Sequence, residues 1–364
     1  MTFDILGQGT ATPDHSATRE ESIRLVQECF APGDHERRLA PALYRMAGVH
    51  KRHSVMLGPS DGGPEVDRYD ILHAPHDASD RGPSTRVRME KYEADAGALA
   101  LRAAWTALND AKIEAAAITH LVTVSCSGFS APGVDIALMK RLGLRSSLQR
   151  LHVGFMGCQG AMNGLRAANA FAQSDPDARV LLCAVELCSL HYHYGWDPEK
   201  VVANALFADG AAALVGAAGA GDESRWRLAA SGACLVPDSE DAMTWRIGDH
   251  GFLMTLSPRV PALIETHLRT WLDEWLHEHG LSVASVPTWA VHPGGPRILT
   301  SAAGALGLDS SALSVSRDIL REYGNMSSPT ILFILDRLRM ANAPRPCVAI
   351  GFGPGLAIET ALFL

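Results

Sequence analysis

The sequence lacks the features that mark membrane, secreted and zinc-finger proteins. No apolar run approaches the roughly 20 residues that a membrane-spanning helix needs. The first residues lack the basic start and the long apolar segment of a signal peptide. The seven cysteines are odd in number and scattered, with no CxxC pair, which argues against a disulfide framework or a zinc site built on cysteines. We therefore expect a cytoplasmic protein with reduced thiols.

An excess of positive charge is also missing. The net charge is −8 and acidic and basic residues are intermixed, which argues against nucleic acid as the main partner. The 364 residues, 47% of them hydrophobic and 20% charged, are typical of a globular protein with a large core.

Short apolar runs alternate with segments of helical periodicity, which indicates an α/β fold. Buried strands are expected over residues 120–125, 151–156, 179–185, 288–291 and 347–351. The spacing of apolar residues predicts helices over 134–142 and 260–279, and a further helix is expected from Gln159 onward. Gly143 and Gly280 follow the first two helices, as is typical of helix ends.

Two segments show no such periodicity. Residues 57–85 are rich in Gly, Pro, Asp and His, and we expect a long surface loop there. Residues 216–224 are small and polar and predict a seam between two halves, 1–220 and 221–364.

Residues 156–160 (MGCQG) place a cysteine at a turn between an expected strand and an expected helix. The partial positive charge at a helix start lowers the pKa of a thiol and favours the thiolate. The flanking glycines let a substrate approach closely. Cys158 is therefore the candidate nucleophile. The alternative is a buried structural cysteine, which is the interpretation preferred for four others: Cys29, Cys183, Cys234 and Cys347.

A histidine stands where the strand 288–291 ends, in residues 291–296 (VHPGGP). Strand ends are where α/β folds place their chemistry. The His292 imidazole could form an ion pair with a Cys158 thiolate and donate a hydrogen bond to a thioester oxygen. With 15 histidines in the chain, its position alone does not exclude a structural role within the turn.

The third candidate is Asn325, in residues 324–330 (GNMSSPT). An asparagine cannot act as acid or base, but its amide is a fixed neutral donor. Beside His292 it would stabilise the enolate oxygen that forms when a malonyl thioester loses carbon dioxide, a contribution of about 3 kcal/mol per donor. Two alternatives stay open: a cap or turn before the helix at Ser328, and a protease-like asparagine that orients the histidine.

Four longer segments decide between these alternatives, because together they resemble the type III polyketide synthases of the chalcone synthase superfamily. They are WAVHPGGP (289–296), EYGNMSS (322–328), GFGPGL (351–356) followed by Glu359-Thr360, and ALFADGAAA (205–213). The resemblance extends over nearly the whole chain, with the segments in the family's order. The glycine pattern at 351–355 alone would be weak, since no helix follows it as a dinucleotide loop requires.

The resemblance implies a thiolase-like αβαβα five-layer fold, built from a half with Cys158 (1–220) and a half with His292 and Asn325 (221–364). It implies a homodimer that loads an acyl-CoA starter on Cys158. His292 and Asn325 then drive decarboxylative condensation with malonyl-CoA, without a metal or redox cofactor. Cyclisation to a resorcinol, pyrone or polyhydroxynaphthalene releases the product.

The same resemblance assigns substrate-contacting positions. Phe207 matches the gatekeeper between the coenzyme A tunnel and the cavity, and Met254 stands at the second gate, where a methionine makes the gate more flexible. Ser327 matches a residue that shapes the cavity. Arg45 is the best candidate for the coenzyme A phosphates, ahead of Lys51 and Arg52.

Other positions depart from the plant enzymes. Cys126 and Cys188 replace threonines and resemble bacterial tetrahydroxynaphthalene-type synthases; lining the cavity and structural packing both stay open for them. His191 replaces another cavity threonine, which puts plant-like cyclisation in doubt. Ala131 stands where a methionine of the partner subunit usually enters the cavity, which would leave extra room.

Two other functions were weighed. A β-ketoacyl carrier-protein synthase III stops after one condensation, and the segment 324–328 (GNMSS) favours a polyketide synthase over it. A non-catalytic thiolase-fold partner is disfavoured by the intact Cys158, His292 and Asn325. Starter, chain length and ring closure depend on the shape of a cavity, which the sequence does not specify.

Overall fold

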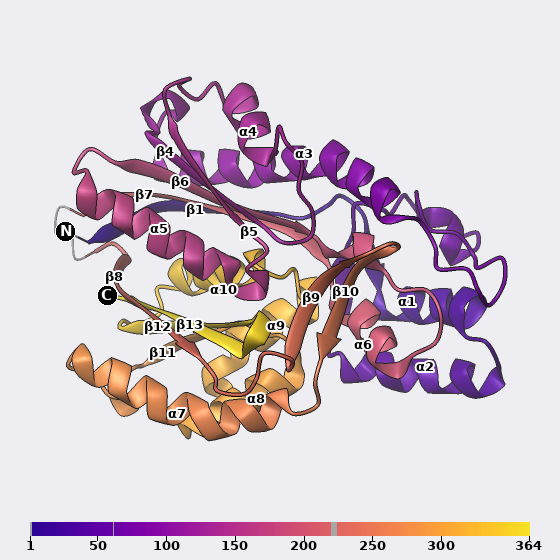
Figure 1. Cartoon of the computed structure of the whole chain (residues 1–364). Coiled ribbons are helices and arrows are strands. Elements are labelled where there is room, and N and C mark those ends of the chain that lie inside the picture. Colours follow the sequence, from indigo (N-terminus) through magenta and orange to yellow (C-terminus); the bar gives the residue numbers. More distant parts are fainter. Residues whose placement is uncertain (1, 61, 220–223) are drawn as a thin grey trace.

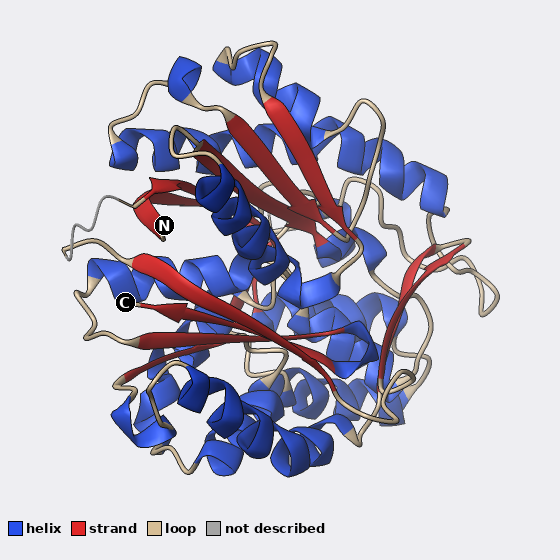
Figure 2. Ribbon diagram, turned by 60° about the vertical axis from the view of Figure 1, so that its left-hand side comes forward, coloured by secondary structure: helices blue, strands red, loops and turns tan. Residues whose placement is uncertain are grey.

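The computed structural model describes residues 2–60, 62–219 and 224–364. Its centre is a nine-stranded mixed sheet (Figures 1 and 2). From one edge to the other the strands are β11 (Thr288–Val291), β12 (Cys347–Gly353), β13 (Ala357–Phe363), β8 (Arg227–Leu235), β1 (Phe3–Ala11), β7 (Asp209–Ala218), β6 (Arg179–Leu187), β4 (His120–Ser125) and β5 (Gln149–Gly154).

The sheet consists of two halves that are barely joined. Strands β1 and β8 pair only at Phe3↔Leu228 and Asp4↔Arg227. Both halves begin with parallel pairs at the outer edge and continue with antiparallel pairs towards this junction. The predicted boundary between residues 220 and 221 lies outside the described residues.

Helices cover both halves and fill the space between them (Figure 1). The outer N-terminal layer is formed by α3 (Thr85–Ala111), the middle layer by α5 (Gly160–Ser174) and α10 (Pro329–Met340), and the outer C-terminal layer by α7 (Val260–Glu278) and α8 (Pro296–Leu306). Three buried apolar clusters occupy the three helical layers. The five-layer αβαβα prediction is confirmed.

Local sequence explains two of these layers. Helix α3 lies unusually close to β1, where a Cβ on Gly9 would stand 2.5 Å from the Ala103 carbonyl oxygen. Alanines at 96, 100, 103, 104 and 107 form the buried face of α3 and permit this approach. In α10, residues 331–335 are all buried, as expected for a helix enclosed between two sheets.

Most of the remaining helices and strands lie at one end of the sheet, whereas α4 packs beside α3 (Figure 1). The helices are α1 (Arg19–Leu25), a π-helix (Val26–Phe30), α2 (Asp34–Met46), α4 (Val134–Leu142), α6 (Pro198–Leu206) and α9 (Ser314–Tyr323). The short strands are β2 (Ser16–Thr18), β3 (Lys51–His53), β9 (Met243–Gly248) and β10 (Gly251–Leu256). Among the described residues, none of the helices combines the length and apolarity that crossing a bilayer requires.

Most of the predicted elements are confirmed. The strands at 120–125 and 288–291 and the helix 134–142 match, and the helix from Val260 ends one residue early, at Glu278. The bounds of the strand predicted for 151–156 are wrong, because β5 covers 149–154. Phe155 has a φ of 60°, which ends the extended backbone. Residue 61 lies outside the described residues; the rest of the segment 57–85 is a loop apart from one 3₁₀ turn at Glu65–Arg68 and the first residue of α3.

Candidate active site

Cys158 lies on a 3₁₀ turn, Gly157–Gln159, that connects the end of β5 to α5. Gly157 has a φ of 72°, and a Cβ there would approach Cδ of Pro354 to 2.4 Å, so only glycine fits this turn. The Cys158 side chain is buried, with 8% exposed.

The expected thiolate is not what this environment favours. Burial raises the pKa of the Cys158 thiol to about 11; the nearby Ser327 and Asn325 side chains lower it in part, and the negative charge of Glu186 adds to the rise. The helix start carries about half a positive charge, too little to outweigh the cost of burying an anion. The burial of Cys158 thus opposes the thiolate that the helix start was expected to favour.

His292 follows β11 and is held by a hydrogen bond from its backbone N–H to the Ile350 carbonyl on β12 (2.8 Å). Its ring is completely buried, and burial lowers its pKa to about 3, so the imidazole is neutral. Within the described part of the chain, neither ring nitrogen has a hydrogen-bond partner. The expected ion pair with Cys158 is thus absent among these residues, and His292 retains an N–H that is free for a substrate oxygen.

Asn325 lies between α9 and α10, and a parallel bridge pairs it with Phe207. The Ser327 backbone N–H donates to Asn325 Oδ1 at 2.8 Å. With its oxygen occupied, the amide has its NH₂ group left to donate, and it lies close enough to the Cys158 thiol to lower the pKa of that thiol. Asn325 is not the cap of α10, whose N-cap residue is Ser328. The tertiary fold therefore brings Asn325 to Cys158 from 167 positions further along the chain.

Two adjoining cavities meet at a common wall beside Cys158. The residues that line both are Cys188, Phe207, Trp245 and Met254. The inner cavity also contacts Cys126, Cys158 and Ser327, and the outer one contacts Arg52 and His191. Each cavity has about 30 Å³ of free space, room for about one or two water molecules. Phe207 and Met254 thus stand at a boundary that is closed in this conformation.

Chains of known function share this whole architecture. The family model for the chalcone and stilbene synthase N-terminal domain matches residues 65–220, and the model for the C-terminal domain matches 227–364. The chain belongs to the chalcone and stilbene synthase family. It is a type III polyketide synthase, an enzyme of decarboxylative condensation. The single-condensation and non-catalytic alternatives do not fit these findings.

Individual relatives of this polyketide synthase support the assignment. The "Alpha-pyrone synthesis polyketide synthase-like Pks18" of Mycobacterium tuberculosis is 33% identical over 99% of this chain and 90% of the relative. The 1,3,6,8-tetrahydroxynaphthalene synthase of Streptomyces peucetius is 34% identical over 97% of this chain and 90% of the relative. The crystal structure of PKS-I from the brown alga Ectocarpus siliculosus superposes with a TM-score of 0.90, at 31% identity, covering 100% of this chain and 98% of that one.

The cavity residues of this synthase differ in how far their polar atoms are already engaged in hydrogen bonds. Cys126 Sγ lies 3.3 Å from Ser327 Oγ, and Ser327 has a φ of 56° that turns its hydroxyl into the inner cavity wall. His191 is fully engaged: Nδ1 accepts the Phe252 N–H (2.9 Å) and Nε2 donates to the Ser127 carbonyl (2.6 Å). Burial lowers the pKa of His191 to about 3, so this neutral ring supports the wall and does not move protons.

Two predicted substrate contacts lie away from these cavities. Arg45 is exposed in the last turn of α2 and lines neither cavity, so a role with coenzyme A stays a prediction. Ala131 is exposed beside a surface hollow that includes Phe129 and His152, and its contact with a partner subunit also stays a prediction.

Arg52 is unsuited to the phosphate contact suggested for it. The side chain is buried, and its guanidinium donates to Ser22 Oγ and to the backbone carbonyls of Asn204 and Phe207. With its donors occupied in this way, Arg52 holds the end of α6 and the backbone of Phe207. In the sequence, Arg52 stands among basic residues that look exposed. Nothing there indicated that its side chain is buried and hydrogen-bonded inside the protein.

Two residues of the site were missed in the sequence. Trp245 lines both cavities and donates from Nε1 to the Cys126 carbonyl (2.7 Å). Glu186 is completely buried and accepts hydrogen bonds from Ser127 Oγ and Ser328 Oγ (both 2.6 Å) and from the Cys126 N–H (2.9 Å). A carboxylate in the apolar run of β6 was the available signal for Glu186.

Proposed function

We propose that Cys158, His292 and Asn325 are the catalytic residues of this type III polyketide synthase. The observation that carries the proposal is the place of the Asn325 amide beside the Cys158 thiol, with its oxygen occupied by the Ser327 N–H so that its NH₂ group is left to donate. The buried, unpartnered imidazole of His292 supplies a second neutral donor. Two neutral donors beside a thiol suit a reaction in which negative charge develops on a thioester oxygen.

The proposed reaction begins when the Cys158 sulfur attacks the carbonyl carbon of an acyl-CoA. Coenzyme A leaves with the thiol proton, and the acyl group stays on Cys158. Malonyl-CoA then loses carbon dioxide, and the electron pair of the broken bond forms an enolate whose oxygen accepts hydrogen bonds from His292 and Asn325. The enolate carbon attacks the acyl carbonyl, the Cys158 thiolate leaves, and the extended chain can be reloaded. No metal or redox cofactor enters these steps.

Malonyl-CoA decarboxylation tests the two donors separately from condensation. His292→Ala and Asn325→Ala should each lower its rate about 10²- to 10³-fold, because each removes one donor to the enolate oxygen. His35→Ala and Asn109→Ala, at exposed helix positions, are the matched controls and should retain the wild-type rate. Undiminished decarboxylation in both site variants would refute these roles. Radiolabelled acyl-CoA that still attaches covalently to Cys158→Ala would refute the nucleophile.

We also propose that the extended chain is released by cyclisation. Relatives named for an α-pyrone and for tetrahydroxynaphthalene support a pyrone, resorcinol or polyhydroxynaphthalene product. Mass spectrometry of products from short, long and aromatic acyl-CoAs, with malonyl units counted, tests this. A single β-ketoacyl product from every starter would contradict it.

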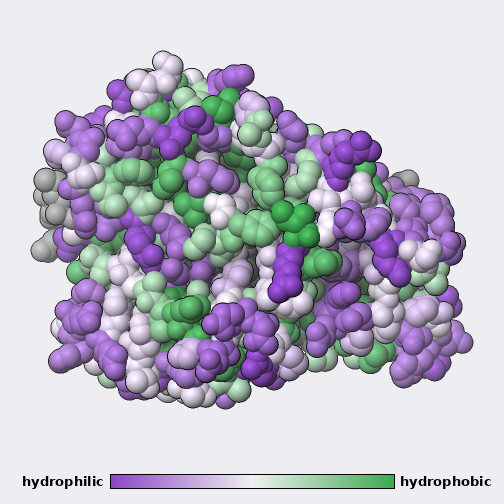
Figure 3. Space-filling model, viewed as in Figure 1, coloured by the Kyte–Doolittle hydropathy of each residue, from purple (hydrophilic) through white to green (hydrophobic). Residues whose placement is uncertain are grey.

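We further infer a cytoplasmic homodimer that forms through β5. This strand is the edge of the sheet, and five of its six residues are exposed. An uncovered edge strand is a template for pairing with a second chain. Apolar side chains surround it, including Phe129 (51% exposed) and Phe155 (36%), and Figure 3 shows apolar surface between the end of β5 and the β9–β10 hairpin. The cytoplasmic location is supported by seven cysteines that are all free thiols.

A further inference from the structure

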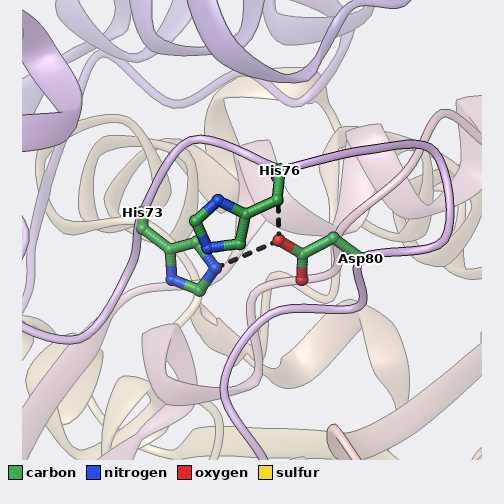
Figure 4. A group of neighbouring side chains, drawn as sticks. All are labelled: His73, His76 and Asp80. Carbon is green, nitrogen blue, oxygen red and sulfur yellow. Dashed lines mark hydrogen bonds and ion pairs between the residues drawn. The ribbon is translucent and has the colours of Figure 1, made fainter.

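The loop that precedes α3 brings two histidines and an aspartate together at the surface (Figure 4). His73 Nε2 lies 3.1 Å from Asp80 Oδ2, and the rings of His73 and His76 stack with centroids 4.9 Å apart. One nitrogen from each ring and a carboxylate oxygen all lie within 4.8 Å of one another. This cluster takes no part in the reaction above.

The cluster stands on a firmly held turn. The Tyr194 hydroxyl accepts the His73 backbone N–H (2.9 Å) and donates to the His73 carbonyl (2.7 Å). Gly82 packs against the Tyr194 ring so closely that a Cβ would stand 2.5 Å from it. Asp80 accepts backbone N–H groups from Gly82 (2.8 Å) and His76 (3.0 Å).

We propose that His73, His76 and Asp80 bind one divalent transition-metal ion, of which Zn²⁺ fits best. Two imidazole nitrogens and one carboxylate oxygen are a zinc ligand set that leaves the fourth tetrahedral position for water. Magnesium and calcium prefer ligand sets made entirely of oxygen, so they suit the cluster poorly. The zinc ion replaces the hydrogen bond between His73 and Asp80.

The geometry needs only a small adjustment. In a tetrahedral site with metal–ligand bonds of about 2.0 Å, ligand atoms stand about 3.3 Å apart, so the widest separation here must close by roughly 1.5 Å. The His76 side chain is exposed, and within the described residues its ring makes no hydrogen bond that would oppose a rotation.

The surrounding charge also admits a cation. Asp77, on the same turn, adds a second carboxylate, whose Oδ1 accepts from Ser79. The neighbouring Arg81 directs its guanidinium to the backbone carbonyls of Ala78 and Asp80, so one positive charge faces two negative ones.

The site would fasten the loop to the wall of the outer cavity. Tyr194, which holds His73, follows directly after two residues that line that cavity, Tyr192 and His193. A zinc ion bound by residues 73, 76 and 80 would cross-link this part of the loop. Tyr194 would then hold the cross-linked loop through its hydrogen bonds to His73. The ion has a structural role there and does not touch the reacting atoms.

Calorimetric titration of the chelator-stripped full-length chain with ZnCl₂ tests the site. Wild type should bind one zinc ion per chain, and His76→Ala and Asp80→Ala should each weaken binding at least about tenfold. His35→Ala, which removes an exposed histidine outside the cluster, should bind like wild type. Cys158→Ala should also bind like wild type, which excludes the active-site thiol as the ligand.

Limited trypsin digestion gives a second readout. Zinc should slow cleavage after the exposed Arg81 several-fold in wild type and leave it unchanged in His76→Ala. His76→Gln, which preserves a polar side chain, guards against misfolding, and its melting temperature without metal should equal that of wild type. The proposal is overturned if wild type binds no zinc, or if the His76 and Asp80 variants bind zinc as tightly as His35→Ala does.

Discussion

The residues around the nucleophile form a neutral, buried group. Burial raises the pKa of Cys158 to about 11 and lowers that of His292 to about 3. The uncharged forms of both side chains therefore predominate before substrate binds. In the proposed mechanism, charge appears only when a thioester occupies the site, and the donors of His292 and Asn325 are then already in place, as electrostatic preorganisation requires.

This protonation state can be tested by alkylation of Cys158. Only the thiolate reacts, so with a pKa near 11 the rate of inactivation by iodoacetamide should rise about tenfold per pH unit between about pH 7 and pH 9. Mass spectrometry should locate the adduct on Cys158, and Cys158→Ala gives the background rate. A rate that is already level at neutral pH would show a thiolate–imidazolium pair instead.

Glu186 has a structural role that a conservative substitution should expose. Its carboxylate accepts from Ser127, Ser328 and the Cys126 N–H, so Glu186→Gln would direct an NH₂ group at donors. We expect the free energy of unfolding to fall by about 1–3 kcal/mol, because a buried donor would lose its acceptor. Urea denaturation measures this, with the exposed Glu90→Gln as the control. Equal midpoints for the two variants would contradict the prediction.

At the scale of elements, the β9–β10 hairpin and the end of α6 form the boundary between the two cavities, where the gate is predicted. Trp245 and Met254 are directly opposite each other across the hairpin, and both line the two cavities beside Phe207. Arg52 fixes the backbone of Phe207 from behind. With so little free space on either side, an acyl chain can enter only if one of these side chains moves, and Met254 is the most flexible of them.

Shortening Met254 should therefore change which starters are used. In Met254→Ala, kcat/KM for a long acyl-CoA should rise about tenfold relative to a short one, because the side chain that narrows the boundary is removed. Met254→Phe should shift the ratio in the opposite direction. Steady-state kinetics with a series of acyl-CoAs measures this ratio. An unchanged ratio in both variants would show that Met254 does not limit access.

At the scale of the whole molecule, the nine-stranded sheet ends at an exposed edge. In the proposed dimer, Leu151→Lys on β5 would bring two lysines close together across the two-fold axis. We expect the dimer dissociation constant to rise about tenfold or more, measured by sedimentation equilibrium. Met340→Lys replaces an equally apolar and more exposed side chain at the end of α10 and should leave the dimer intact. Equal dissociation constants for the two variants would place the interface elsewhere.

Much of this molecule follows from short segments of its sequence. Apolar periodicity predicted an α/β fold, the family resemblance implied its five layers, and residues 156–160, 291–296 and 324–330 supplied the three catalytic candidates. Such candidates can be picked from the sequence because strand ends, helix starts and glycine turns are local signals. The difference between the predicted and the observed bounds of β5 arose at Phe155. The backbone of this residue is left-handed, and no local sequence pattern predicts that conformation.

The tertiary structure decided what depends on contacts between distant residues. Protonation is one such property, because the pKa values of Cys158 and His292 follow from burial among side chains contributed by both halves. Three sets of hydrogen bonds are further examples, because each joins residues far apart in the chain. They are the bonds of the buried Arg52, those around Glu186, and the one from Tyr194 to His73. The sequence by itself determined which groups can do the chemistry. Folding determined their charge, their neighbours and the room left for substrate, because those arise only when solvent is excluded.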